Sequence, residues 1–192
     1  VEFDRHTTMI ASGSVLVAGS LINIASCLSP LLPGRTPEEL NNTLDALYVK
    51  HSLASLAPFP FLEDTLDQLQ ALGLPLGIAT NDSETAAYSH LDKIGVTDRF
   101  CYIAGFDSGF GEKPEPGMVT GFAEHLAMPA HHVAMVGDSI HDCKAARAAG
   151  VITIGVLSGG GGEDDLAPHS DYVVNDISAL PQLVNRLNQS EN

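Results

Sequence analysis

The spacing of apolar residues changes near residue 60 of this 192-residue chain. Before that point, apolar positions recur about every three to four residues, which is typical of helices. Ser20 can cap a first helix, which Pro30 ends. Thr36-Pro-Glu-Glu39 has the form of a capping box with proline at the first helical position. The apolar positions that follow it are Leu40, Leu44, Leu47 and Leu56. The first third of the chain is therefore predicted to be mostly helical, up to Pro58 and Pro60.

After residue 60, helical and strand-like segments alternate. Helices are predicted over residues 62–72, 84–94, 116–128, 140–149 and 177–187. Short apolar strands are predicted over residues 76–80, 100–104, 133–136, 151–156 and 172–174. Such alternation predicts parallel pairing and an open α/β sheet, in which ligands bind beyond the carboxyl ends of the strands. We therefore divide the chain into residues 1–58 and residues 59–192, and expect functional side chains just after the strands.

The charge of the chain narrows the classes of ligand. Acidic residues outnumber basic residues 24 to 9, which gives a formal net charge of −15. Such a chain repels the phosphate backbone, so we expect no nonspecific binding to nucleic acid. A small phosphorylated substrate is still compatible with this charge. Its site would need local cations, a bound metal or inward-pointing amides.

The spacing of the cysteines and the hydropathy of the N-terminal segment indicate in which cellular compartment the protein is expected. The three cysteines, Cys27, Cys101 and Cys143, form no CxxC pair, so we expect free thiols in a reducing cytoplasm rather than a zinc site. Residues 15–32 lack charged side chains and are rich in Val, Leu, Ile and Ala. Gly19, Asn23 and several serines dilute this segment, which favours a buried helix over a membrane-spanning one.

Met135-Val-Gly-Asp-Ser-Ile-His-Asp142 carries the sharpest candidate site. An apolar strand ends here, Gly137 permits a tight approach, and Asp138 stands at the strand tip. Asp142 follows four residues later, so a helix that begins near Ser139 would place both carboxylates on one side of its first turn. Two such oxygen ligands suit Mg²⁺. Helix-capping acids are the alternative interpretation of the same residues.

Two further polar segments follow predicted strands. In Gly77-Ile-Ala-Thr-Asn-Asp-Ser83, the Thr80 hydroxyl and the Asn81 amide could hold a phosphate at a helix N-terminus, although an ordinary N-cap cluster would look the same. Lys113 precedes a proline-started helix in Gly111-Glu-Lys-Pro-Glu-Pro116. Most such lysines are solvated, but a fixed cation at this place could stabilise both a phosphate and its carboxylate attacker.

Together, these segments resemble three of the four motifs of the haloacid dehalogenase superfamily, in the family's order. Thr80-Asn81 matches the second motif, whose Ser/Thr binds the phosphoryl group, and Lys113-Pro114 matches the third. Gly137-Asp138-Ser139, with Asp142, matches the fourth motif, which holds Mg²⁺. The helical first third is similar to the tail of the α-helical cap of phosphoglycolate phosphatase-like members. The resemblance implies an α/β fold, a Rossmannoid parallel sheet with helices on both faces, plus part of a cap domain.

The first motif of that family, DxDx[TV], is absent from this sequence. Its first Asp is the family's nucleophile and its second the general acid–base. Glu2 and Asp4 do not follow an apolar strand, so Asp4 is expected in a loop and is not assigned as the nucleophile. In this family the first core strand lies between the strands that end at Thr80 and Asp138. Without it, their edges would be unpaired. We hypothesise an additional N-terminal strand in the native protein, an idea that direct pairing of those two strands would contradict.

The resemblance implies a Mg²⁺-dependent phosphoric monoester hydrolase that acts on a small phosphorylated metabolite, similar to phosphoglycolate, through an aspartyl-phosphate. Thr80, Asn81 and Lys113 would bind the substrate, and Thr80 and Lys113 would have catalytic roles. Asp138 would bind Mg²⁺, and Asp142 would do so directly or from the surrounding shell. We expect a monomer or homodimer without a membrane partner.

Two alternatives stay open. A phosphosugar mutase shares these motifs, and a non-catalytic α/β protein that binds a phosphorylated ligand fits a chain without the nucleophile. A metal-free dehalogenase is disfavoured by the Asp138/Asp142 pair. His131 and His132 are expected at the surface, and His141 is expected to point away from the aspartates. Residues 159–165 are predicted to form a flexible acidic loop, without the lysine of a P-loop.

Overall fold

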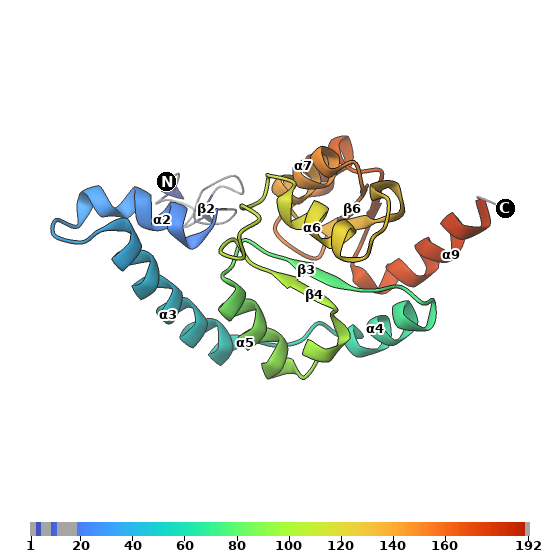
Figure 1. Cartoon of the computed structure of the whole chain (residues 1–192), viewed down its shortest axis with the longest axis horizontal. Coiled ribbons are helices and arrows are strands. Elements are labelled where there is room, and N and C mark those ends of the chain that lie inside the picture. The colour runs from blue at the N-terminus through green and yellow to red at the C-terminus, as the bar shows by residue number, and fades with distance from the viewer. Residues whose placement is uncertain (1–2, 5–8, 11–18, 191–192) are drawn as a thin grey trace.

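Helices and strands alternate from residue 62 onward in the computed structural model, which describes residues 3–4, 9–10 and 19–190 (Figure 1). The α-helices are α2 (Leu21–Leu28), α3 (Pro37–Ser55), α4 (Leu62–Ala71), α5 (Glu84–Ile94), α6 (Gly117–His125), α7 (Ile140–Ala149), α8 (Glu163–Leu166) and α9 (Leu180–Ser190). The strands are β1 (Phe3–Asp4), β2 (Met9–Ile10), β3 (Gly77–Ala79), β4 (Tyr102–Ala104), β5 (Ala134–Gly137), β6 (Ile152–Val156) and β7 (Tyr172–Val174). Short 3₁₀ turns are η1 (Ser29–Leu31), η2 (Thr97–Arg99), η3 (Ala130–His132), η4 (Ala167–His169) and η5 (Ile177–Ala179).

The five strands after residue 76 form two parallel sheets rather than one. β3 pairs with β4, and Ile78 lies opposite Ile103. β5, β6 and β7 form the second sheet in that order, with Val136 opposite Ile154. These registers confirm the predicted parallel pairing. Parallel neighbours need a crossover connection, which the helical segments between successive strands provide. Among the described strands, β3 and β5 do not pair with each other. Direct pairing of these two strands would have contradicted the hypothesis of an additional N-terminal strand, and it does not occur among them.

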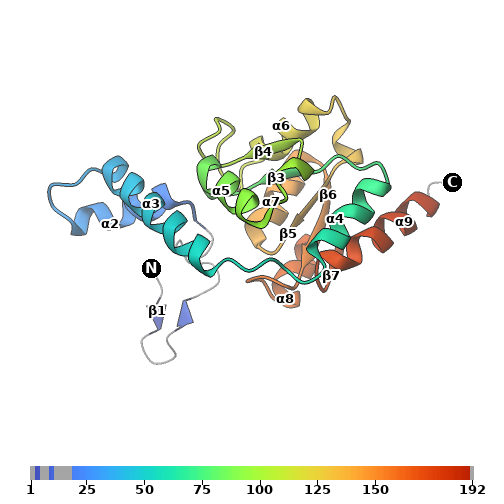
Figure 2. The same ribbon diagram turned by 90° about the horizontal axis from the view of Figure 1, so that it is seen from below.

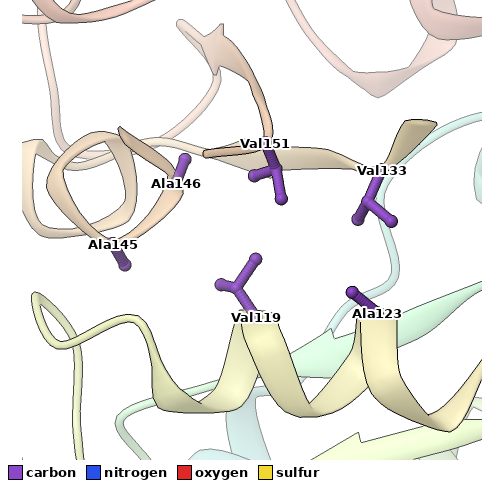
Figure 3. Packing of buried hydrophobic residues seen from close by; sticks show 6 residues of the cluster. All are labelled: Val119, Ala123, Val133, Ala145, Ala146 and Val151. Carbon is purple, nitrogen blue, oxygen red and sulfur yellow. The ribbon is translucent and has the colours of Figure 1, made fainter. Parts of the chain in front are cut away.

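Helices cover both faces of this arrangement (Figure 2). On one face, α7 packs on β5 and β6, and α6 packs on α7 around Val119, Val133 and Ala146. Figure 3 shows the α6 side chains pointing toward Val133 and Val151. On the other face, α4 and α9 pack around Leu69 and related apolar residues. The members of this second cluster are Leu69, Ile154, Leu180 and Leu183. The predicted fold class, with helices on both sides of parallel strands, is confirmed.

An apolar cavity of about 560 Å³ lies between the two sheets. Its walls include residues 76–79, in and just before β3, and residues 133–138, in and beside β5. Leu66 and Leu69 of α4 line it as well, and so do Met118 and Phe122 of α6. The two neighbouring strand edges thus face a common apolar space.

The helical first part of the chain consists of α2 and α3, which pack against each other and extend to one side of the α/β body (Figures 1 and 2). Thr36 and Glu39 form the predicted capping box at the start of α3. The expectation of a buried helix within residues 15–32 is only partly met. In α2 only Ala25 is buried, and residues 15–18 lie outside the described part. Within the described residues, no helix is long and apolar enough to cross a membrane.

Two local expectations were wrong. Asp4 belongs to β1, which pairs antiparallel with β2, rather than to a loop. The backbone pairing of Asp4 with Met9 is a contact that a search for apolar strands does not detect. Residues 163–166 form the helical turn α8 instead of a flexible acidic loop. The three acids in its first turn favour the helix because they interact with its dipole.

Candidate functional site

A second cavity, of about 460 Å³, opens at the carboxyl ends of β3 and β5. All five site residues predicted from the sequence line it: Thr80, Asn81, Lys113, Asp138 and Asp142. Thr80 and Asn81 follow β3, and Asp138 follows β5. Lys113 comes from the segment between β4 and α6, and Asp142 from the first turn of α7. The structure therefore brings together residues that lie up to 62 positions apart, counted from residue 80 to residue 142.

Lys113 and Asp142 form a mostly buried ion pair at the centre of this group. Lys113 Nζ lies 2.7 Å from Asp142 Oδ1, and the two side chains are 12% and 7% exposed. The same Nζ donates to the backbone carbonyl of Ala79 at 2.7 Å. Because an ammonium group has three N–H donors, these contacts leave one for a ligand. A buried charge of this kind is tolerated because its partner is also held by hydrogen bonds.

Asp142 is fixed by the start of its own helix. Ser139 is the N-cap of α7, and its backbone amide and hydroxyl both donate to Asp142 Oδ2, at 3.1 and 2.7 Å. The capping interpretation of Asp142 is therefore correct, and it coexists with the ion pair to Lys113. The predicted tight approach at Gly137 is also present. A Cβ atom there would lie 2.2 Å from Asp142 Cβ.

Asn81 connects the first two loops. Its Nδ2 donates to the Lys113 carbonyl at 2.9 Å, and the Lys113 amide donates to Asn81 Oδ1 at 2.8 Å. Thr80 Oγ1 accepts from the Asp82 amide at 3.1 Å, a bond that does not use the hydroxyl hydrogen of Thr80. Ser83 is the N-cap of α5. The 80–83 loop thus combines an ordinary helix cap with two side chains that face the cavity.

Asp138 is held from the opposite side by the loop after β6. The amide of Gly160 donates to Asp138 Oδ2 at 2.8 Å, and the amide of Gly161 donates to the Asp138 carbonyl at 2.9 Å. No other protein donor to the Asp138 carboxylate is present among the described residues.

The cavity is acidic overall, since four aspartates line it against Lys113 and Lys144. Those aspartates are Asp82, Asp138, Asp142 and Asp165.

Asp82 links the cavity to α3. Tyr48 Oη donates to Asp82 Oδ2 at 3.0 Å. Burial raises the pKa of the Asp82 carboxyl above its ordinary value, although the hydrogen bond from Tyr48 and the charges of His90 and Lys113 act in the opposite direction. Burial also raises the pKa of the Tyr48 phenol, and the neighbouring charge of Asp82 adds to that effect. The raised pKa of Asp82 reflects a carboxylate that is partly removed from water.

The expectation for His141 was wrong. Its ring lines the cavity, and Nδ1 lies 3.4 Å from the Lys113 carbonyl. Asp142 turns back to Ser139, and the Lys113 loop runs beside the same first turn, so the residue before Asp142 also faces the site. His131 and His132 are exposed, as predicted. The site roles of Tyr48, Asp82 and the glycines after β6 were missed. Only Asp82, which directly follows Thr80-Asn81, carried a signal in its position.

Comparison with known proteins places this chain in a family. A family model described as haloacid dehalogenase-like hydrolase matches residues 32–156. The chain belongs to this family. This match confirms the predicted resemblance to the haloacid dehalogenase-like hydrolases. It also agrees with the parallel α/β fold of the structure.

Relatives and solved structures agree with this membership. A phosphoglycolate phosphatase from Neisseria meningitidis is 35% identical over 150 residues, which cover 76% of this chain and 62% of the relative. Another, from Agrobacterium fabrum, is 33% identical over 156 residues, which cover 79% and 67%. A haloacid dehalogenase-like family hydrolase from Streptococcus pneumoniae shares the fold with a TM-score of 0.74 at 20% identity, covering 88% of this chain and 78% of that one. The chain thus spans 62% of the length of the Neisseria relative.

Proposed function

We propose that this chain forms the phosphoryl-binding and metal-binding part of a phosphatase that hydrolyses a small phosphorylated metabolite, with phosphoglycolate as the first substrate to test. The observation that carries the proposal is the convergence of Thr80, Asn81, Lys113, Asp138 and Asp142 on one cavity at the carboxyl ends of β3 and β5. Relatives named phosphoglycolate phosphatase support the substrate class.

Lys113 and Thr80 would hold the transferring phosphoryl group. Lys113 Nζ has one N–H left after its contacts with Asp142 and Ala79, and the Thr80 hydroxyl hydrogen is not used by the Asp82 amide. Asn81 would act on Lys113, because two of its hydrogen bonds fix the lysine backbone. Donors that are fixed before the substrate binds stabilise charge in the transition state at little reorganisation cost.

The acidic side chains fit Mg²⁺. Asp138 supplies a carboxylate with a single protein donor, whereas both oxygens of Asp142 already accept from Lys113 or Ser139. We therefore place Asp138 as the direct ligand and Asp142 as its neighbour that holds Lys113. No cluster of three or more His, Cys, Asp or Glu suited to a metal occurs in the described part of the chain. One direct carboxylate from Asp138 is compatible with Mg²⁺, which usually takes one or two carboxylates and completes its shell with water and phosphate oxygens. The ion would offset phosphate charge.

The chemistry would follow the aspartyl-phosphate route that the family resemblance implies. We assign the nucleophile to no described residue, since Asp142 is engaged by Lys113 and Asp138 faces the glycine loop. We propose that it belongs to the additional N-terminal strand. The division into a cap remainder (residues 1–58) and a core (residues 59–192) also stays a prediction. The packing of α2 and α3 against each other, to one side of the α/β body, supports it.

Replacing Lys113 by Ala tests the phosphoryl-binding role. We expect phosphate release from phosphoglycolate by the complete protein with Mg²⁺ to fall roughly 10²–10³-fold, since one fixed donor is lost. Lys93→Ala, on the exposed last turn of α5, is the matched control. Because Lys113→Ala also leaves Asp142 without its cation, Lys113→Arg and a circular dichroism spectrum check that the fold persists. Unchanged turnover in Lys113→Ala would refute the role.

Product analysis separates the alternatives. A phosphatase releases inorganic phosphate, whereas a phosphosugar mutase converts a sugar phosphate into its isomer. Mg²⁺ binding without either product, in the complete protein, would favour a non-catalytic module that binds a phosphorylated ligand.

A further inference from the structure

Three consecutive glycines after β6 surround Asp138. The Gly160 amide donates to the carboxylate oxygen Oδ2 at 2.8 Å, and the Gly161 amide donates to the Asp138 carbonyl at 2.9 Å. One segment therefore binds both the side chain and the backbone of the same residue. These contacts tie the end of β5 to the loop after β6, 22 residues later in the chain.

Two of these glycines have no room for a side chain. A Cβ atom at Gly159 would lie 1.9 Å from Asp138 Oδ2 and 2.4 Å from Asp138 Cβ. At Gly161 it would lie 2.4 Å from the Asp138 carbonyl oxygen. At Gly160 the nearest atom, Asp138 Oδ2, would be 3.9 Å away, which is ordinary van der Waals contact. The φ angles of these three residues lie outside the left-handed region, so glycine is required here by close packing.

We propose that Gly159, Gly160 and Gly161 form a clamp that fixes the Asp138 carboxylate in its Mg²⁺-binding orientation. The Gly160 amide engages Oδ2 and directs the remaining lone pairs of the carboxylate toward the cavity. Gly159 has no Cβ atom, and this leaves the space that the Asp138 carboxylate occupies. This inference rests on the metal role proposed for Asp138. It makes the three glycines positioning residues, which act through Asp138.

Gly159→Ala tests the clamp, and Gly162→Ala is its matched control in the same glycine run. The added methyl group at residue 159 forces Asp138 out of its orientation, whereas at residue 162, which is not part of the clamp, it meets no atom closer than Asp165 Oδ2 at 3.9 Å. Partners that orient a metal ligand change metal affinity by about 10–100-fold. We therefore expect isothermal titration of the chain with MgCl₂ to show at least about ten-fold weaker binding for Gly159→Ala. Binding by Gly162→Ala should match that of the wild type.

Combining Gly159→Ala with a substitution of Asp138 shows whether its effect on Mg²⁺ binding acts through that carboxylate. Asp138→Asn removes the carboxylate charge, and adding Gly159→Ala to it should not weaken Mg²⁺ binding further, because the two changes act on one ligand. If Gly159→Ala alone does not fold, the double variant Asp138→Gly/Gly159→Ala should fold, since the atoms that block the methyl group belong to the Asp138 side chain. Circular dichroism measures this recovery.

Each outcome decides a different claim. Equal Mg²⁺ affinity of folded Gly159→Ala and wild type would overturn the clamp and leave the metal role of Asp138 intact. Failure of the double variant to fold would also overturn the clamp. A wild-type chain that binds no Mg²⁺ would overturn both the metal role and the clamp that depends on it, whereas phosphate release without Mg²⁺ would leave the phosphatase proposal standing.

Discussion

Asp82 contacts the cavity on one side and α3 on the other. Its neighbours are Tyr48 and Asp45 from α3, His90 from α5 and Lys113 from the loop before α6. Burial is the largest influence and raises the pKa of the carboxyl, and the charge of Asp45 acts in the same direction. The charged form of Asp82 is therefore less stable in the fold than in water. Asp82 lies beside the proposed phosphate site, and the hydrogen bond that the Tyr48 hydroxyl donates to its carboxylate fixes the position of this side chain.

The raised pKa of Asp82 predicts a pH-dependent effect on stability. A carboxyl whose pKa is higher in the folded state contributes most below its unfolded value, which is ordinarily 3.8, and loses that contribution as the pH rises through the folded pKa. Asp82→Asn is neutral throughout and has no such loss. We expect the free energy of unfolding of Asp82→Asn, minus that of wild type, to be larger at pH 7 than at pH 4, because only the wild type loses this contribution as the pH rises.

Urea unfolding at both pH values measures this difference. Asp98→Asn, on the exposed turn η2, controls for the loss of one negative charge from an acidic chain. A relative stability of Asp82→Asn that falls as the pH rises would contradict the assignment.

The α3 helix depends on its capping box, because most of its side chains are exposed. Thr36→Ala removes the hydrogen bond that the Glu39 amide donates to Thr36 Oγ1. We expect a loss of about 1 kcal/mol of helix stability and faster hydrogen exchange in the first turn of α3. Thr43→Ala, in the middle of the same helix, removes a bond from the Thr43 hydroxyl to the Glu39 carbonyl and should leave that exchange unchanged or slower. Equal exchange in Thr36→Ala and wild type would show that the packing of α2 alone holds the turn.

Local chemistry explains which elements could be predicted from sequence. α5 and α7 have the predicted bounds, since Ser83 and Ser139 cap their starts and Gly95 and Gly150 adopt positive φ at their ends. Strand ends were less predictable. The strand expected over residues 76–80 is Gly77–Ala79 in the structure, because its bounds depend on pairing with a distant strand.

The same distinction applies to the site. Thr80, Lys113 and Asp138 could be predicted because parallel strands bring their carboxyl ends to one edge. Tyr48 and the glycines after β6 could not, since their contacts join segments 34 and 22 residues apart that no local pattern relates. His141 was misplaced for a similar reason, because its neighbour is the Lys113 loop.

At the scale of the whole molecule, the cavity between β3 and β5 separates the β3–β4 sheet from the β5–β6–β7 sheet. α6 bridges them, since it packs on β3 and β4 and also on α7. α4 and α9 contact each other on the opposite face. Among the described residues, the two sheets are thus joined by helices rather than by backbone hydrogen bonds. The strand expected between Thr80 and Asp138 would add those bonds and fill an apolar space of about 560 Å³.

This arrangement predicts that the 192-residue chain binds the hydrophobic dye ANS, because the apolar walls between β3 and β5 are open to small molecules. Ala134→Leu places a larger side chain in that cavity and should reduce the fluorescence of bound dye, whereas Ala148→Leu, exposed on α7, should not. Adding an apolar strand before Val1 should abolish dye binding and raise the melting temperature, since it would pair with both open edges. Dye binding that persists with the strand attached, or that Ala134→Leu leaves unchanged, would place the dye elsewhere and remove the support that this cavity gives to the additional strand.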